Sequence, residues 1–256
     1  MSKTMVLIRK EFLEQWRTKK ILILCIIFVF VAIASPIIAK ITPEILKTIS
    51  IPGLSINLPD PTYKDSLDQF IKNISQIALL VIVFVIAGAV SDEKAKKTLE
   101  IILTKPISRV RFIFSKFISY FFSIAIIFTA SSVIFYVYTV TAFGAFSFIN
   151  FSLMALVVLL YIFMVMAITI LASTIVNNSI IAGVVGFIGS ILFGVIFDLF
   201  EGIKRFSPNL IFSNYQDVVS KGWDNELIYP MIIILSIIAI SIITAISAFR
   251  HQEIER

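Results

Sequence analysis

Residues 117–197 contain no Asp, Glu, Lys or Arg. A soluble domain carries about 25% charged residues to cover its surface, whereas 15% of this chain is charged and 59% is hydrophobic. A stretch this long without charge therefore indicates a lipid environment, in which the backbone must satisfy its own N–H and C=O groups within helices. Because about 20 apolar residues cross the hydrocarbon, the stretch predicts three spanning helices.

Three further stretches are uncharged and are bounded by charged residues: 21–39, 73–91 and 227–249. Turn chemistry at 139–150 and at Asn177-Asn178-Ser179 divides the long middle stretch. The sequence thus predicts an all-α integral membrane protein in which residues 1–256 form a single transmembrane domain. We place its six spans at residues 21–39, 73–91, 112–139, 151–176, 180–199 and 228–249.

The distribution of Lys and Arg predicts the orientation. One side of the six-span arrangement holds fifteen of these residues and the other side seven, and the richer side is normally cytoplasmic. Both termini are then cytoplasmic, and we expect a prokaryotic plasma membrane. In an alternative reading the first span is a cleaved signal peptide, but Glu11 and Glu14 precede it, and such acids are unusual there.

Residues 4–18 have the pattern of an amphipathic helix. Its apolar face includes Ile8, Phe12 and Trp16, and its polar face includes Lys10, Glu14 and Arg17. Tryptophan together with basic residues suits a helix that lies in the membrane interface, with Ile8, Phe12, Trp16 and Arg17 as its characteristic residues. A solvated basic flank is the alternative.

The connection at residues 92–111 begins with charges, continues into a short apolar run and reaches Pro106, after which Ser108 can cap the next helix. The apolar run holds Leu99, Ile101, Ile102 and Leu103. A loop exposes such residues when they lie against the bilayer or against another protein. Composition alone leaves both alternatives open.

Small residues recur every fourth position in the predicted span at 180–199: Ala182, Gly186, Ser190 and Gly194. Such a stripe allows close helix approach, either within one subunit or at a dimer interface. Asp198 follows at the predicted outer end of this span, where an acid is usually solvated.

The order of these parts, and two short motifs within them, resemble the ABC-2 type ABC transporter permeases. The first motif is Ile8-Arg9-Lys10-Glu11-Phe12 with Arg17. The second comprises Glu93-Lys94, Thr98-Leu99-Glu100, Leu103-Thr104-Lys105-Pro106-Ile107-Ser108-Arg109 and Lys116. One departure is Lys97, where the family usually has Gly before the Thr, and it predicts a more regular helix through this segment.

The resemblance implies a type V exporter-like permease fold in which two permease subunits, either two copies or a copy and a homologue, meet two P-loop ATPase subunits. The 92–111 connection would then be the coupling loop that docks on the ATPase. The implied docking residues are Glu93, Lys94, Thr98, Leu99, Glu100, Ile101, Ile102 and Leu103. The N-terminal amphipathic helix would be the connecting helix at the inner leaflet.

Several chemistries are excluded by sequence. The chain has no P-loop motif, and its one Cys and one His cannot build a Cys cluster or a zinc-protease site. We expect no catalytic residues and no metal, with ATP and Mg held by the partner ATPase, and we read the net charge of +6 as positive-inside charge rather than nucleic-acid binding. A non-transporting subunit of an ABC-like complex and a lipid-modifying membrane enzyme are the alternatives to an exporter permease.

Overall fold

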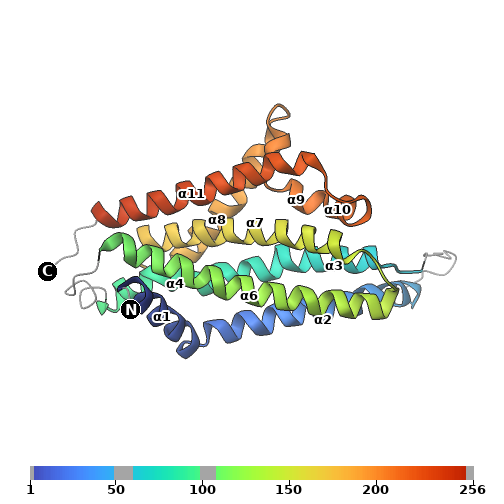
Figure 1. Cartoon of the computed structure of the whole chain (residues 1–256), viewed down its shortest axis with the longest axis horizontal. Coiled ribbons are helices and arrows are strands. Elements are labelled where there is room, and N and C mark those ends of the chain that lie inside the picture. The colour runs from blue at the N-terminus through green and yellow to red at the C-terminus, as the bar shows by residue number, and fades with distance from the viewer. Residues whose placement is uncertain (1–2, 49–59, 99–107, 252–256) are drawn as a thin grey trace.

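The computed structural model describes residues 3–48, 60–98 and 108–251, and these residues are largely helical. Six of the helices are long and apolar enough to cross a membrane, and they run side by side along the longest axis of the molecule (Figure 1). The N-terminal helix and the end of the last helix lie at the same end of the bundle. We call this the terminal end and the opposite one the distal end.

The spanning helices are α2 (Lys20–Thr48), α4 (Leu79–Ala95), α6 (Arg109–Phe143), α7 (Phe148–Ile175), α8 (Ser179–Leu199) and α11 (Ile228–His251). Helix α4 continues α3 (Tyr63–Asn73) through a π-helical segment, η1 (Ile74–Ala78). The remaining elements are α1 (Lys3–Arg17), α9 (Leu210–Ser213), α10 (Tyr215–Lys221) and the short 3-10 turns η2 (Lys204–Phe206) and η3 (Asn225–Leu227). The all-α, six-span prediction is confirmed.

The helices run past the predicted limits of the spans. Helix α2 continues to Thr48 through Pro36 and Pro43, and the second span begins at Tyr63 in α3. The prediction counted uncharged residues, and their number reflects the thickness of the hydrocarbon. A helix can continue into water beyond the hydrocarbon, so it can be longer than the uncharged stretch. Helices α6 and α7 likewise begin earlier or end later than predicted.

Side-chain caps set several helix starts. Ser108 accepts a hydrogen bond from the backbone of Arg111 at the start of α6, as predicted. The Asn178 side chain accepts hydrogen bonds from the backbone amides of Ile180 and Ile181 and so starts α8. Satisfying these amides makes a sharp turn between α7 and α8 possible.

Helix α7 is the centre of the bundle. It packs against α4, α8 and α11. A larger share of its membrane-spanning part is buried inside the protein than in the other candidate spans. Aromatic rings join the neighbouring helices: Phe70 stacks on Phe135 at 4.0 Å between centroids, and Phe28 meets Phe128 edge-on at 6.0 Å. The bundle is thus held by apolar packing around α7.

The distal end carries a small helical cap formed by α9 and α10 (Figure 1). Asp68 in α3 accepts hydrogen bonds from the Tyr215 hydroxyl, at 2.6 Å, and from the Gln216 amide, both in α10. The Asn150 side-chain amide donates to the Val219 carbonyl at 3.2 Å. These bonds fix α10 to the middle of α3 and to the start of α7.

Candidate functional site

The predicted coupling loop begins where α4 ends at the terminal end of the bundle. Glu93 and Lys94 lie in the last turn of α4, and Thr98 is exposed just beyond it. The other predicted docking residues, Leu99, Glu100, Ile101, Ile102 and Leu103, lie outside the described residues. The site is therefore described from the residues on either side of the loop.

Lys97 corrects one expectation from the sequence. We predicted a more regular helix here, but Lys97 has a φ of +55° and follows Lys96, which caps α4. A left-handed residue after a helix cap is usually Gly, because a side chain is strained in that conformation. The tight bend that a Gly would allow is therefore formed with a lysine.

Three charged side chains from three helices meet inside the protein beside this bend. The Lys116 ammonium, in α6, lies 3.0 Å from Glu11 in α1 and 3.0 Å from Glu93 in α4. Lys116 is 1% exposed, Glu11 2% and Glu93 5%. Buried charges are tolerated when they are paired and hydrogen-bonded, and here the pairing joins the two helices that flank the loop to the N-terminal helix.

Lys10 completes this group, which we call the charge network: Lys10, Glu11, Glu14, Glu93 and Lys116. The Lys10 ammonium contacts all three carboxylates, at 3.0 Å from Glu11 and 2.9 Å from Glu14. Burial alone would lower the pKa of Lys10, but the carboxylates of Glu11 and Glu93 outweigh burial and raise it. Burial raises the pKa of Glu14, but Lys116 and Lys10 outweigh it and hold that pKa below its usual 4.5.

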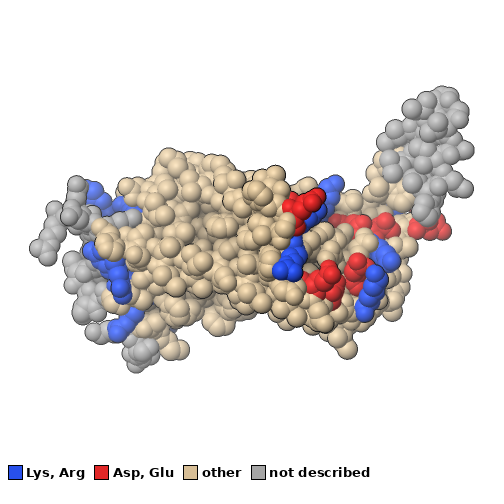
Figure 2. Space-filling model, turned by 90° about the horizontal axis from the view of Figure 1, so that it is seen from above, with Lys and Arg blue, Asp and Glu red and all other residues tan. Residues whose placement is uncertain are grey.

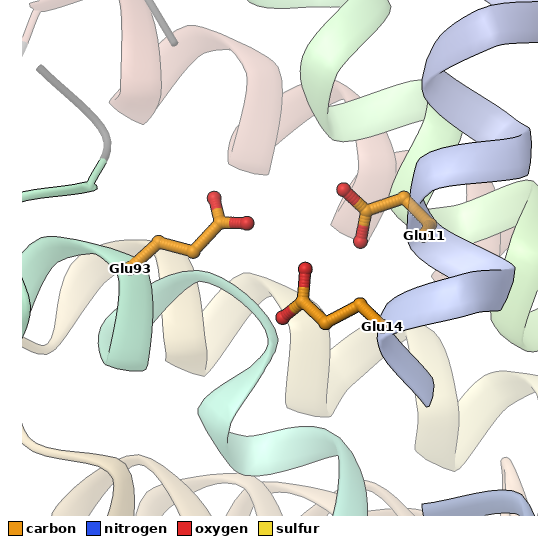
Figure 3. Close-up of side chains that lie close together, drawn as sticks. All are labelled: Glu11, Glu14 and Glu93. Carbon is orange, nitrogen blue, oxygen red and sulfur yellow. The ribbon is translucent and has the colours of Figure 1, made fainter. Parts of the chain in front are cut away.

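The three carboxylates point toward one another from α1 and α4 (Figure 3). One oxygen of each lies within 4.8 Å of the others, close enough for a metal ion. The ammonium groups of Lys10 and Lys116 contact the same carboxylates. The arrangement is therefore an ion-pair network in which lysines supply the positive charge.

A polar seam extends the charge network along α1 and α6. The Gln15 side chain donates to Ser119 at 3.0 Å and accepts from Ser123 at 2.7 Å. Lys20, at the start of α2, donates to the Tyr120 hydroxyl at 3.2 Å. Helix α1 is thus fastened to α6 by buried hydrogen bonds over its last two turns.

The two ends of the loop are also tied to other spans. Before the loop, Lys94 donates to the backbone carbonyl of Thr174 at the end of α7. After it, Arg109 donates to the carbonyls of Phe249 and Arg250 at 2.9 and 2.8 Å, at the end of α11. A displacement of the loop would therefore act directly on α1, α4, α6, α7 and α11.

The predicted interfacial residues lie on the outer side of α1. Trp16 is 71% exposed, Arg17 is exposed, and Ile8 and Phe12 are half-buried. On the side that faces α6, Glu11 and Gln15 are buried. Of the predicted polar face, Lys10 and Glu14 are half-buried and Arg17 is exposed.

Sequence reasoning missed the contacts of Glu11, Gln15 and Lys116. Glu11 entered as an acid that argues against a signal peptide, and both Glu11 and Lys116 entered as residues that carry the family resemblance. Lys116 had one usable signal, because it is the last charge before the uncharged stretch at 117–197. A lysine one turn inside an apolar helix needs a carboxylate partner.

The small-residue stripe of α8 faces the interior of the subunit. Ala182, Gly186, Ser190 and Gly194 are buried, and a methyl group at Gly186 would lie 3.1 Å from the Thr169 hydroxyl of α7. The stripe lets α8 approach α7 and is covered by its own subunit. Its burial agrees with the first of the two alternatives from the sequence, packing within one subunit.

Comparison with known proteins bears on this arrangement. The model of a family described as ABC-2 family transporter protein matches residues 5–253. A transmembrane protein of Bacillus subtilis (strain 168), YxlG, is 24% identical over 116 residues. That alignment covers 44% of this chain and 45% of YxlG, so the matched part spans less than half of the relative's length.

Proposed function

Since the chain belongs to the ABC-2 family of transporter proteins, in which it is a membrane permease subunit, we propose that it exports a substrate with energy from a separate P-loop ATPase. The ATPase docks on the loop at 92–111 at the terminal end. ATP and Mg are bound by the ATPase, because the permease sequence has no P-loop motif. A second permease copy or a homologue completes the transporter.

The observation that carries this proposal is the charge network at the base of the loop. A docked ATPase can drive the permease only if its two states make different contacts with the permease. Glu93 is three residues from the helix cap at the loop, and its partners Lys10 and Lys116 lie in α1 and α6. Movement of the loop is thereby transmitted to α1, α4 and α6 together.

The cost of separating the buried ion pairs favours movement of the loop and the three helices as one rigid unit. Separating one member of a buried ion pair leaves an uncompensated charge, which costs about 3–5 kcal/mol. The loop therefore moves with the three helices more easily than it moves away from them. ATP binding would shift the loops, the spans would rearrange toward an outward path, and hydrolysis would reset them.

Charge supports an orientation with the terminal end in the cytoplasm. On the face drawn in Figure 2, the terminal end carries Lys and Arg, whereas acidic and basic residues mix at the distal end. By the positive-inside rule this distribution supports a cytoplasmic side that holds both termini and the loop. A prokaryotic plasma membrane is the expected location.

The test is co-purification of the tagged protein from its native membrane, with ATP hydrolysis assayed on the eluate. In the docking variant, Leu99, Ile102 and Leu103 are changed to Asp. The control changes three exposed distal residues, Lys64, Ser220 and Lys221, to Asp. We expect an ATPase to co-purify with the parent and the control, and to be lost from the docking variant.

A second variant separates docking from transmission. Changing both Glu11 and Lys116 to Met removes one carboxylate and one ammonium together and leaves the loop intact. We expect the ATPase to remain bound while the part of ATP hydrolysis that depends on the permease falls. Absence of any co-purified ATPase from the parent would refute the proposal.

A further inference from the structure

A cleft of about 200 Å³ opens in the distal half of the bundle, away from the charge network. It lies between the π-helical segment η1, helices α7 and α8, and the residues that lead into α9. Its polar lining residues are Ser75, Tyr161, Ser190 and Asn209. A cavity of about 150 Å³ holds benzene, so this cleft can take a small head group and the start of a chain.

The Tyr161 side chain is the least satisfied group in the cleft. It is 6% exposed and meets the Phe212 ring edge-on at 4.6 Å between centroids. Its hydroxyl makes no hydrogen bond to a described residue, although it lines the cleft. The hydroxyl is open to the cleft and can form a hydrogen bond with a ligand there.

The other polar groups mainly offer acceptors. Ser190 already donates to the Gly186 carbonyl at 2.7 Å, and Ser75 to the Lys72 carbonyl at 3.0 Å. Each hydroxyl oxygen can then only accept from a ligand. Among the described residues that line the cleft none is basic, so the lining suits a ligand that donates hydrogen bonds.

The Asp198 carboxylate is linked to the cleft through a hydrogen bond from Asn209. The Asn209 side-chain amide donates to the Asp198 carboxylate at 2.7 Å, and Asn209 lines the cleft. Asn209 packs directly over Gly194, where a Cβ would come within 2.5 Å of its side chain. The close approach that Gly194 allows thus holds Asn209 between the acid and the cleft.

Aromatic rings supply the remaining walls. Tyr161, Phe187 and Phe212 all line the cleft, and ring faces attract ammonium groups. The cleft also borders η1, and π-helical segments occur frequently at functional sites. Acceptors, aromatic rings and a nearby carboxylate together fit a cation with an apolar body.

We propose that this cleft binds the ammonium end of an amphipathic amine. The ammonium lies among Tyr161, Ser190 and Asn209, and the alkyl part runs along Leu79, Val165 and Ile191 toward the lipid. Asp198 stabilises the bound cation through Asn209. The cleft does not involve the loop at 92–111. A failure of amine binding would therefore be a separate result from a failure of ATPase co-purification.

The test compares three probes that share one chain: decylammonium, decanol and decanoate. Radiolabelled probe binds the purified full chain in nanodiscs, and binding to empty nanodiscs is subtracted. We expect saturable binding that is tightest for decylammonium and weakest for decanoate. Asp198→Asn should weaken decylammonium binding about tenfold and leave decanol unchanged, and Tyr161→Phe should weaken decylammonium binding about threefold.

The matched control is Glu201→Gln, which removes an exposed acid three residues further along the chain. It changes the net charge by the same amount and should alter decylammonium binding less than twofold. Both acids are exposed, so these two variants test the site without disturbing the core. Equal effects of the two variants, equal binding of decanol and decylammonium, or no saturable binding would each overturn the proposal.

Discussion

Lys116 and Glu11 are separated by 105 positions in the sequence, and the ammonium of one lies 3.0 Å from the carboxylate of the other. This pair joins the N-terminal helix to the first turns of α6 inside the protein. Both residues are almost completely buried. Their charges are therefore compensated by each other and by those of Lys10 and Glu93 rather than by water.

Removing the Lys116 charge should therefore destabilise the protein. Lys116→Met leaves Glu11 and Glu93 buried with one ammonium fewer, and we expect a loss of about 3–5 kcal/mol in the free energy of unfolding. Unfolding by denaturing detergent in mixed micelles measures it. The double variant Lys116→Met with Glu11→Met should recover most of the loss, and a double variant as unstable as the single one would contradict this account.

The left-handed backbone of Lys97 predicts that a glycine at this position would stabilise the protein. Its left-handed backbone costs a residue with a side chain about 1–2 kcal/mol, so Lys97→Gly should raise the free energy of unfolding by about 1 kcal/mol. Lys96 is the control, because its φ of −85° is ordinary for any residue and Gly there should lower stability. If both variants moved in the same direction, strain at Lys97 would not be the cause.

Acid should loosen helix α1 through Glu14. The pKa of Glu14 is lower in the folded protein than its ordinary 4.5. Its contribution is thus complete above about pH 4.5 and is lost as the pH falls through the folded value. Trp16 fluorescence in a Trp223→Phe background reports the attachment of α1, and Glu14→Gln should weaken the acid transition.

The distal cap should loosen when Tyr215 loses its hydroxyl. That hydroxyl donates to Asp68 at 2.6 Å, and a hydrogen bond to a charged group is worth about 1.5–3 kcal/mol. Tyr215→Phe should therefore speed amide hydrogen exchange in α10 while leaving exchange in α7 unchanged. Tyr138→Phe is a control, because Tyr138 is an exposed tyrosine of α6. Uniformly faster exchange would indicate a global effect instead.

The buried stripe of α8 predicts sensitivity to size. A Cβ at Gly186 would lie 3.1 Å from the Thr169 side chain and 3.2 Å from its Cα. Gly186→Leu should cost about 1–3 kcal/mol by overpacking against α7, measured by thermal unfolding in detergent. Gly202→Ala meets nothing within 4 Å and should be neutral. A stable Gly186→Leu protein would show that α8 does not pack as described.

The sequence was sufficient to predict the fold class and the six spans. Uncharged runs report directly on the thickness of the hydrocarbon, and Ser108 starts a helix where its cap chemistry predicts. Helix ends such as Thr48 could not be predicted from uncharged runs, because a helix can continue through polar residues after it leaves the membrane. Helix α2 does so and also continues through Pro43.

The candidate site was less accessible from sequence. A single chain position does not reveal whether Glu11 faces water or Lys116, because both arrangements keep the same helical periodicity. Lys97 was misread because the structure accepts a strained lysine where the family usually has Gly. Contacts between α1, α4 and α6 arise from tertiary packing and leave no local pattern.

The π-helical segment at Ile74–Ala78 has a consequence for the length of the chain. Successive residues of an α-helix turn by about 100°, and a π-helical segment holds one residue more than a regular helix would. Asp68 on one side of it reaches Tyr215, and Glu93 on the other reaches Lys116. Deleting one residue of this segment would therefore return it to a regular α-helix and keep both ends aligned, whereas deleting a second would rotate one end by about 100°, so that this helix could satisfy its partner at one surface of the membrane but not at both.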